Sequence, residues 1–132
     1  MEPSSARPWP KGIFAITIFV EDLQAAKQFY LRVFGLPVDN EDDNSAVFKF
    51  GDLLINLLKT TAAGELVKPA KVARREDGSR FVFTIHVEDV DAMCKELTAR
   101  GVELLNGPVD RPWGVRTASF KDPGGHLWEI AK

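Results

Sequence analysis

The chain has 132 residues, of which 45% are hydrophobic and 27% charged, and this is the size and composition of one globular domain. Its 17 Lys and Arg residues and 19 Asp and Glu residues give a formal net charge of −2, so no excess of positive charge attracts nucleic acid or an anionic membrane. The single cysteine, Cys94, cannot form an intrachain disulfide, which is typical of the reducing cytosol. We therefore expect a soluble cytoplasmic protein that binds neither nucleic acid nor membrane.

Residues 1–12 contain three prolines and lack the apolar stretch of a secretory signal, so they predict an extended N-terminal arm. The longest apolar runs, residues 13–20 and 53–58, are far shorter than the roughly 18 residues that a membrane-spanning helix needs. We expect one domain over residues 13–131.

The most informative feature of the sequence is an internal repeat. Residues 20–23 read Val-Glu-Asp-Leu, and residues 87–90 read Val-Glu-Asp-Val. Each copy follows a run rich in β-branched and aromatic residues and precedes apolar residues at helical spacing. The repeat predicts two similar halves, each with a strand that leads into a helix.

Both predicted helices have start and stop signals. Asp22 and Asp89 are suitable N-cap residues, because their carboxylates can accept hydrogen bonds from the first turn. Gly35 and Gly101 are suitable helix ends, since glycine readily adopts the left-handed conformation that stops a helix.

Short strand-like runs follow each helix, and turn residues separate the last two runs of each half. The runs are residues 46–50 and 53–58 in the first half, and residues 116–121 and 126–130 in the second. We therefore expect an α+β fold of two βαβββ halves, residues 13–58 and 81–131. Residues 59–80 form a polar linker between them, whose charged stretch 71–77 is interpreted as a solvated loop because acidic residues directly follow the basic ones.

Alternate residues of a strand point to opposite faces of a sheet, so the strands predict which side chains can meet a ligand. Ile18 and Val20 share an aliphatic face that we expect under a helix, which leaves Thr17 and Phe19 on the other face. In the second half the corresponding mixed face carries Val82, Thr84 and His86.

The tandem βαβββ pattern, together with Asp-Pro-Gly-Gly-His-Leu-Trp-Glu-Ile at residues 122–130, resembles the vicinal oxygen chelate superfamily of glyoxalases, bleomycin-resistance proteins and extradiol dioxygenases. The resemblance implies that each half curls into an open half-barrel of mixed sheet with its helix on the outside. It also implies that the concave faces form one cleft, often across a homodimer, and that the ligand binds there.

Enzymes of this superfamily usually hold a divalent metal with one residue near the start and one near the end of each half. The resemblance places these positions at Ala15, Asn56, Val82 and Glu129, of which only Glu129 is a strong ligand. We therefore expect no cofactor and a protein similar to the metal-free bleomycin-resistance branch.

Several side chains are candidates for the site, and each has a structural alternative. Glu129 is the strongest candidate for a functional residue. The structural alternative is that Glu129 is a buried carboxylate whose charge Arg116 neutralises. His86 could transfer protons, or it could have a purely structural role. Trp113 could stack on a planar anion that Arg116 binds through its guanidinium. His126 is interpreted as a solvent or turn residue. The predicted ligand-binding residues are Thr17, Phe19, Asn56, Thr84, His86, Trp113, Arg116 and Glu129, with Glu129 and His86 as the catalytic candidates.

The sequence favours binding or sequestration of a small aromatic or amphiphilic molecule, without a metal, by a homodimer. The alternative is a metal-dependent lyase, isomerase or dioxygenase that uses Glu129 with an atypical ligand set such as His86 and Asn56. A third possibility is a regulatory or assembly protein whose cleft is empty.

Overall fold

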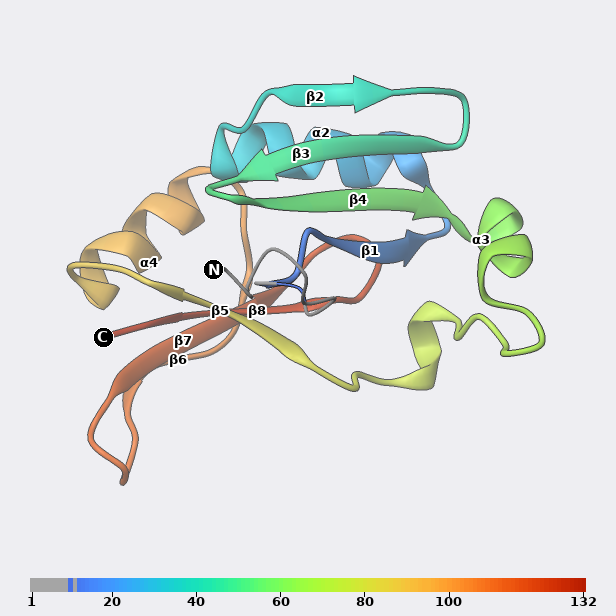
Figure 1. Ribbon diagram of the computed structural model, residues 1–132. Helices are drawn as coiled ribbons and strands as arrows, with labels where there is room; N and C mark the ends of the chain where they lie inside the picture. The colour runs from blue at the N-terminus through green and yellow to red at the C-terminus, as the bar shows by residue number, and fades with distance from the viewer. Residues whose placement is uncertain (1–9, 11) are drawn as a thin grey trace, which may run out of the picture.

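The computed structural model describes Pro10 and residues 12–132, so all but two residues of the predicted N-terminal arm lie outside the described part (Figure 1). Three α-helices and eight strands make up the described chain, with a 3₁₀ turn at Arg75–Asp77. Their order is β1 (Ala15–Val20), α2 (Leu23–Phe34), β2 (Val38–Glu41), β3 (Ser45–Phe50), β4 (Leu53–Lys59), α3 (Thr60–Val67), β5 (Val82–His86), α4 (Val90–Ala99), β6 (Leu104–Asp110), β7 (Arg116–Lys121) and β8 (Leu127–Ala131).

The strands form two four-stranded mixed sheets with the same topology. The first has the order β1-β4-β3-β2 and the second β5-β8-β7-β6. In each sheet the first strand pairs in parallel with the last, and the other neighbours are antiparallel. The predicted α+β fold of two βαβββ modules is confirmed, and the sheets do not close into a barrel.

The two repeated segments cap the helices as predicted. The Asp22 carboxylate accepts a hydrogen bond from the backbone N–H of Ala25 at 3.0 Å, and Asp89 accepts one from Ala92 at 3.0 Å. Each bond satisfies a donor that the first turn of a helix leaves unpaired. Gly35 ends α2 with a φ of 66°, which is the left-handed conformation expected there.

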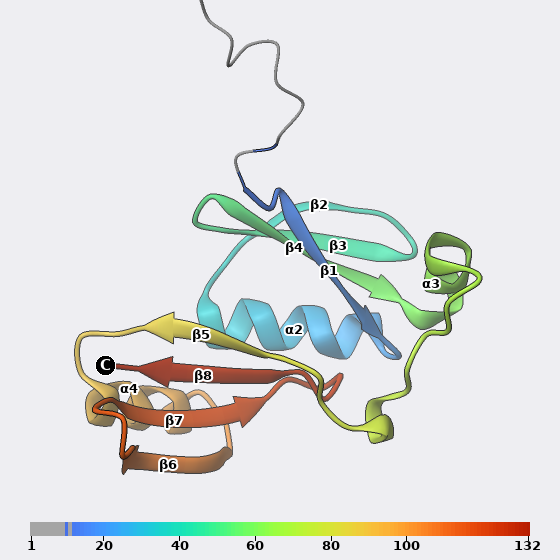
Figure 2. The same ribbon diagram turned by 60° about the horizontal axis from the view of Figure 1, so that its bottom comes forward.

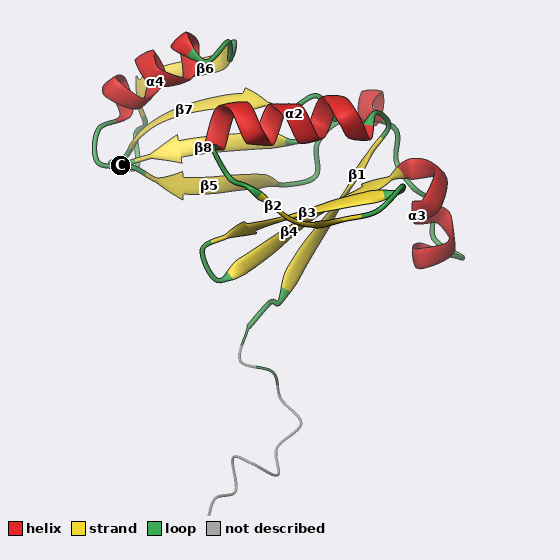
Figure 3. Ribbon diagram, turned by 90° about the horizontal axis from the view of Figure 1, so that it is seen from above, coloured by secondary structure: helices red, strands yellow, loops and turns green. Residues whose placement is uncertain are grey.

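Helix α2 lies between the two sheets and contacts both, as Figures 2 and 3 show from two directions. The Phe34 ring lies 5.4 Å from Phe50 of the first sheet and 4.9 Å from Trp128 of the second, measured between ring centroids. Ile18 and Val20 lie buried in the same apolar cluster, which confirms that the aliphatic face of β1 is covered. One core therefore joins the two modules.

The segment between the modules has more structure than its sequence suggests. Its first part forms α3, which has no side-chain hydrogen bond at its N-terminus and includes Gly64, so the usual signals of a helix start are missing.

None of the helices in the described residues is both long and apolar enough to cross a bilayer.

Candidate functional site

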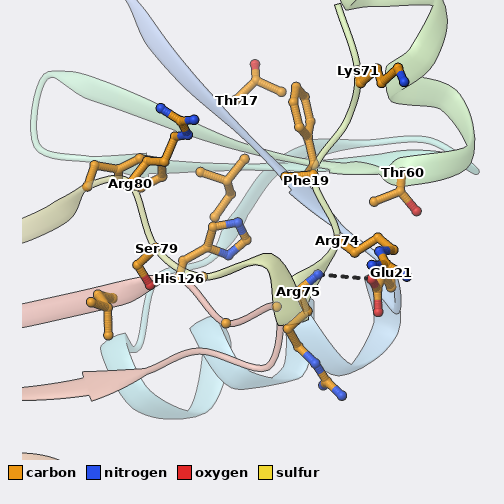
Figure 4. Close-up of a pocket in the computed structure, with 17 residues that line it drawn as sticks. Thr17, Phe19, Glu21, Thr60, Lys71, Arg74, Arg75, Ser79, Arg80 and His126 are labelled. Carbon is orange, nitrogen blue, oxygen red and sulfur yellow. Dashed lines mark hydrogen bonds between the residues drawn. The ribbon is translucent and has the colours of Figure 1, made fainter.

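A cavity of about 310 Å³ lies between β1, the segment 71–81 and the turn that precedes β8 (Figure 4). Thr17 and Phe19 line it from the open face of the first sheet, opposite the face that α2 covers. Phe81 lies at the entry to β5, and His126 lies at the start of the segment that leads into β8. Residues that are distant in the sequence therefore form one concave surface.

Arg75 holds the connecting segment against both modules. Its backbone N–H donates to Oε2 of Glu21 at 3.3 Å, and its Nη1 donates to the backbone oxygen of Pro123 at 3.0 Å. Glu21 directly follows β1, and Pro123 lies in the β7–β8 turn. These two hydrogen bonds position the segment as one wall of the cavity.

His126 is fixed from behind by Asp122. The ring nitrogen Nδ1 lies 3.0 Å from Oδ1 of Asp122, which also accepts the backbone N–H of His126 at 2.9 Å. The His126 ring stacks on Phe81 at 6.3 Å between centroids. Only 15% of the His126 side chain is exposed, so His126 is not a solvent residue, although it does follow the turn at residues 122–125.

The Asp122 carboxylate connects the cavity to the core. Its side chain is fully buried and accepts a hydrogen bond from the hydroxyl of Tyr30 at 2.5 Å, while Trp128 Nε1 donates to that hydroxyl at 3.1 Å. Burial raises the pKa of Tyr30 well above its ordinary value, and the negative charge of Asp122 raises it further. Tyr30 is thus held as the neutral phenol that donates to Asp122.

The predicted ligand-binding residues of the first sheet are close together. Thr17 and Phe19 both line the cavity, and Nδ2 of Asn56 donates to Oγ1 of Thr17 at 3.3 Å. Asn56 Oδ1 is buried and has no hydrogen-bond partner among the described residues. An unsatisfied buried acceptor beside Thr17 is the kind of group that a ligand or a water molecule satisfies.

The predicted residues of the second sheet lie on its uncovered face and do not line the cavity. Oγ1 of Thr84 donates to Oε1 of Glu129 at 2.8 Å across the β5–β8 pair. His86 follows on the same face by strand alternation and is exposed. Thr84, His86 and Glu129 therefore lie outside the lining of this cavity, although Leu127 on the same face of β8 is part of it.

Arg116 is not the partner of Glu129. It donates to Asp91 of α4 at 2.9 Å and to Asp110 at 3.0 Å, and these hydrogen bonds raise the pKa of its guanidinium. The expected pairing fails because Arg116 and Glu129 lie on opposite faces of the second sheet, where Ser119 is the neighbour of Glu129.

Trp113 is also separate from the cavity. It lies in the loop between β6 and β7, and 71% of its surface is exposed. The guanidinium of Arg111 lies over its ring, 5.9 Å from the centroid. The pair Trp113 and Arg116 therefore does not form a clamp around the cavity.

The residues at the four positions implied for metal binding do not fit a metal ion. Ala15 and Val82 have no donor atom in their side chains, while the Asn56 amide donates to Thr17 and Glu129 accepts from Thr84. Across the described residues, no three His, Cys, Asp or Glu side chains gather as a possible ligand set.

Two features of the cavity were not predicted from the sequence. The basic residues of segment 71–80 lie far along the chain from Phe19, and only the fold brings them to one surface. His126 was more accessible to prediction, since it follows Asp122 across a tight Pro-Gly-Gly turn that allows the two side chains to meet.

Two βαβββ modules that share one core are the architecture of a known class of proteins. Comparison of the sequence with known families gives the same class. Residues 12–130 match the family model of the Glyoxalase/Bleomycin resistance protein/Dioxygenase superfamily. The chain belongs to this family. It is 35% identical over 125 residues to the uncharacterized protein YraH of Bacillus subtilis (strain 168), a match that covers 91% of this chain and 97% of that protein.

Solved structures have the same fold. A glyoxalase/bleomycin resistance protein/dioxygenase from Nocardioides superposes with a TM-score of 0.84 and 23% identity, covering 97% of this chain and 87% of that one. A lactoylglutathione lyase from Agrobacterium tumefaciens superposes with a TM-score of 0.74 and 24% identity, covering 92% of this chain and 93% of the other. At these identities the similarity concerns the fold.

Proposed function

We propose that this protein binds a small aromatic or amphiphilic molecule in the cavity beside β1, and that binding requires no metal ion. The observation that carries the proposal is the cavity itself, which is about 310 Å³ and combines the Phe19 and Phe81 rings with the polar His126. Small-molecule sites are typically of this size and place a few polar groups among apolar and aromatic ones.

Two further observations support the proposal, the first for the lack of a metal requirement and the second for binding itself. The positions at which metal-dependent relatives are expected to place ligands hold Ala15 and Val82, neither of which can coordinate. The His126 ring in the cavity is already oriented, since Asp122 fixes it. Such preorganisation lowers the entropic cost of binding.

The test uses the uncharged aromatic probe N-phenyl-1-naphthylamine, with a chelator present, and follows its fluorescence on titration with the protein. We expect saturable binding that weakens about tenfold or more in Phe19→Ala, because one wall of the cavity is lost. The matched control is Phe14→Ala, since Phe14 is 79% exposed and lies outside the cavity lining. Binding that needs added metal, or that is equal in wild type and Phe19→Ala, contradicts the proposal.

A second copy of the chain is the partner we propose for the uncovered sheet faces. Val82 is 47% exposed on β5, beside the Thr84–Glu129 hydrogen bond. Apolar exposure on an open sheet face is typical of a surface that another subunit covers. Light scattering during size-exclusion chromatography should give a molar mass of twice the 14.7 kDa of one chain. A monomer at micromolar concentration contradicts this part of the proposal.

We also propose a cytoplasmic location, in keeping with the single cysteine. Cys94 is buried and burial raises the pKa of its thiol, so it remains in the unreactive protonated form.

A further inference from the structure

The cavity also carries an excess of positive charge, and we infer that its ligand is an anion, with a carboxylate, sulfonate or phosphate group attached to an aromatic or apolar body. This inference rests on the proposed binding function and specifies the chemical class of the ligand. The described lining residues include Lys71, Arg74, Arg75 and Arg80, against a single acid, Glu21. The chain as a whole has a net charge of −2, so this local excess runs against the overall balance.

Of this charge, the acidic residues of the connecting segment cancel only that of Arg74. Glu76 and Asp77 are absent from the described cavity lining, and they pair with Arg74 at 3.7 and 3.4 Å. Among the described residues, Lys71 and Arg80 form no ion pair. Within the described part of the chain, Lys71 and Arg80 are thus lining cations whose charge no acidic side chain offsets, although residues 71–77 are mostly exposed as expected for a solvated loop.

The one acid of the described lining is itself engaged by a backbone hydrogen bond. Oε2 of Glu21 accepts the backbone N–H of Arg75 at 3.3 Å, and Figure 4 shows this bond at one end of the cavity. Lys71 and Arg80 lie on either side of the Phe19 ring in the same view. An amphiphilic anion fits this arrangement, with its apolar body against Phe19 and its charged group between the two cations.

His126 provides a further polar contact near Arg80. Its Nδ1 faces Asp122 at 3.0 Å, so Nε2 is the ring nitrogen left for a ligand. The stacking of His126 on Phe81 keeps the ring in place. The cavity therefore offers an anionic ligand both an aromatic surface and cationic side chains.

The experiment compares two probes that differ only in one charged group. One is 8-anilinonaphthalene-1-sulfonate, and the other is N-phenyl-1-naphthylamine, which lacks the sulfonate. Both are titrated against wild type, Lys71→Gln/Arg80→Gln and the charge-matched control Lys49→Gln/Lys95→Gln. All four substituted residues are exposed, so the variants keep their fold, and equal thermal midpoints verify this.

We expect wild type to bind the sulfonate about tenfold or more tightly than the neutral probe at low salt. This preference should fall below about threefold in Lys71→Gln/Arg80→Gln, persist in the control and weaken as salt rises. Equal affinity for the two probes, or a preference that survives the double substitution, overturns the anion inference while leaving the binding function intact. If neither probe binds, or if Phe19→Ala binds both as well as wild type does, the proposed function fails as well.

Discussion

Nδ1 of His126 lies 3.0 Å from Oδ1 of Asp122, a carboxylate whose side chain has no exposed surface. The other oxygen of Asp122 accepts the hydroxyl of Tyr30 from α2. One buried acid therefore joins the helix of the first module to a cavity residue of the second. The geometry of the cavity depends on this link as much as on the residues that line it.

Asp122→Asn should destabilise the protein by about 2–4 kcal/mol, because an amide cannot accept hydrogen bonds on both sides and leaves a buried donor unpaired. Urea unfolding followed by tryptophan fluorescence measures the change. Asp43→Asn, at an exposed residue, is the matched control. A loss no larger than that of the control would show that the buried carboxylate contributes nothing to stability.

Tyr30 is the only tyrosine in the chain, so its ionisation can be followed directly. Burial and the Asp122 charge raise its pKa well above 10.0 in the folded protein. Ultraviolet absorbance of tyrosinate should therefore remain absent in the folded protein at pH values where the urea-unfolded protein has already ionised. Coincident titration curves of folded and unfolded protein would contradict the buried hydrogen bond.

The same shift makes stability depend on pH at the alkaline end. Above about pH 10 the unfolded chain releases the Tyr30 proton while the folded chain retains it, so the free energy of unfolding should fall as pH rises. The limiting slope for one proton is about 1.4 kcal/mol per pH unit. Tyr30→Phe should remove this component, and an unchanged slope in that variant would assign it to other groups.

Gly107 occupies a position in β6 that only glycine can fill. Its φ is +88°, and a Cβ atom built there would lie 2.4 Å from the backbone oxygen of Thr117. Gly114 has a φ of +97°, but no atom lies within 4 Å of a Cβ atom built there. A substitution of Gly114 therefore measures the cost of the dihedral angle alone. Gly107→Ala should be less stable than Gly114→Ala by more than about 1 kcal/mol. Equal thermal midpoints for the two variants would show that the β6–β7 pair relaxes freely.

Local sequence signals predicted the fold well because they act over a few residues. Asp22 and Asp89 cap helices in the structure as the repeated Val-Glu-Asp segments indicate, and Gly35 ends α2. The repeat also implied equal topology in the two sheets, which the strand orders confirm. The contact of α2 with both sheets could not be predicted, since Phe34 and Trp128 meet only through tertiary packing.

The cavity was predicted less completely, for a related reason. Thr17 and Phe19 follow from strand alternation, and both line the cavity. Arg80 and Lys71 come from a segment without periodicity, whose path depends on the contacts of Arg75 with Glu21 and Pro123. The acidic neighbours in sequence pair with Arg74, whereas Lys71 and Arg80 line the cavity without an ion pair to any described residue.

The most direct test of the binding site is a nitrogen-15 NMR titration of the full chain with N-phenyl-1-naphthylamine in the presence of a chelator. The account predicts saturable shifts of backbone amides concentrated in the ranges 17–19, 71–81 and 124–127, which contain most of the residues that line the cavity. Saturable shifts centred instead on Thr84 and Glu129, with the cavity amides unchanged, would place the ligand on the open face of the second sheet. That result, or the absence of any saturable shift, would contradict the account.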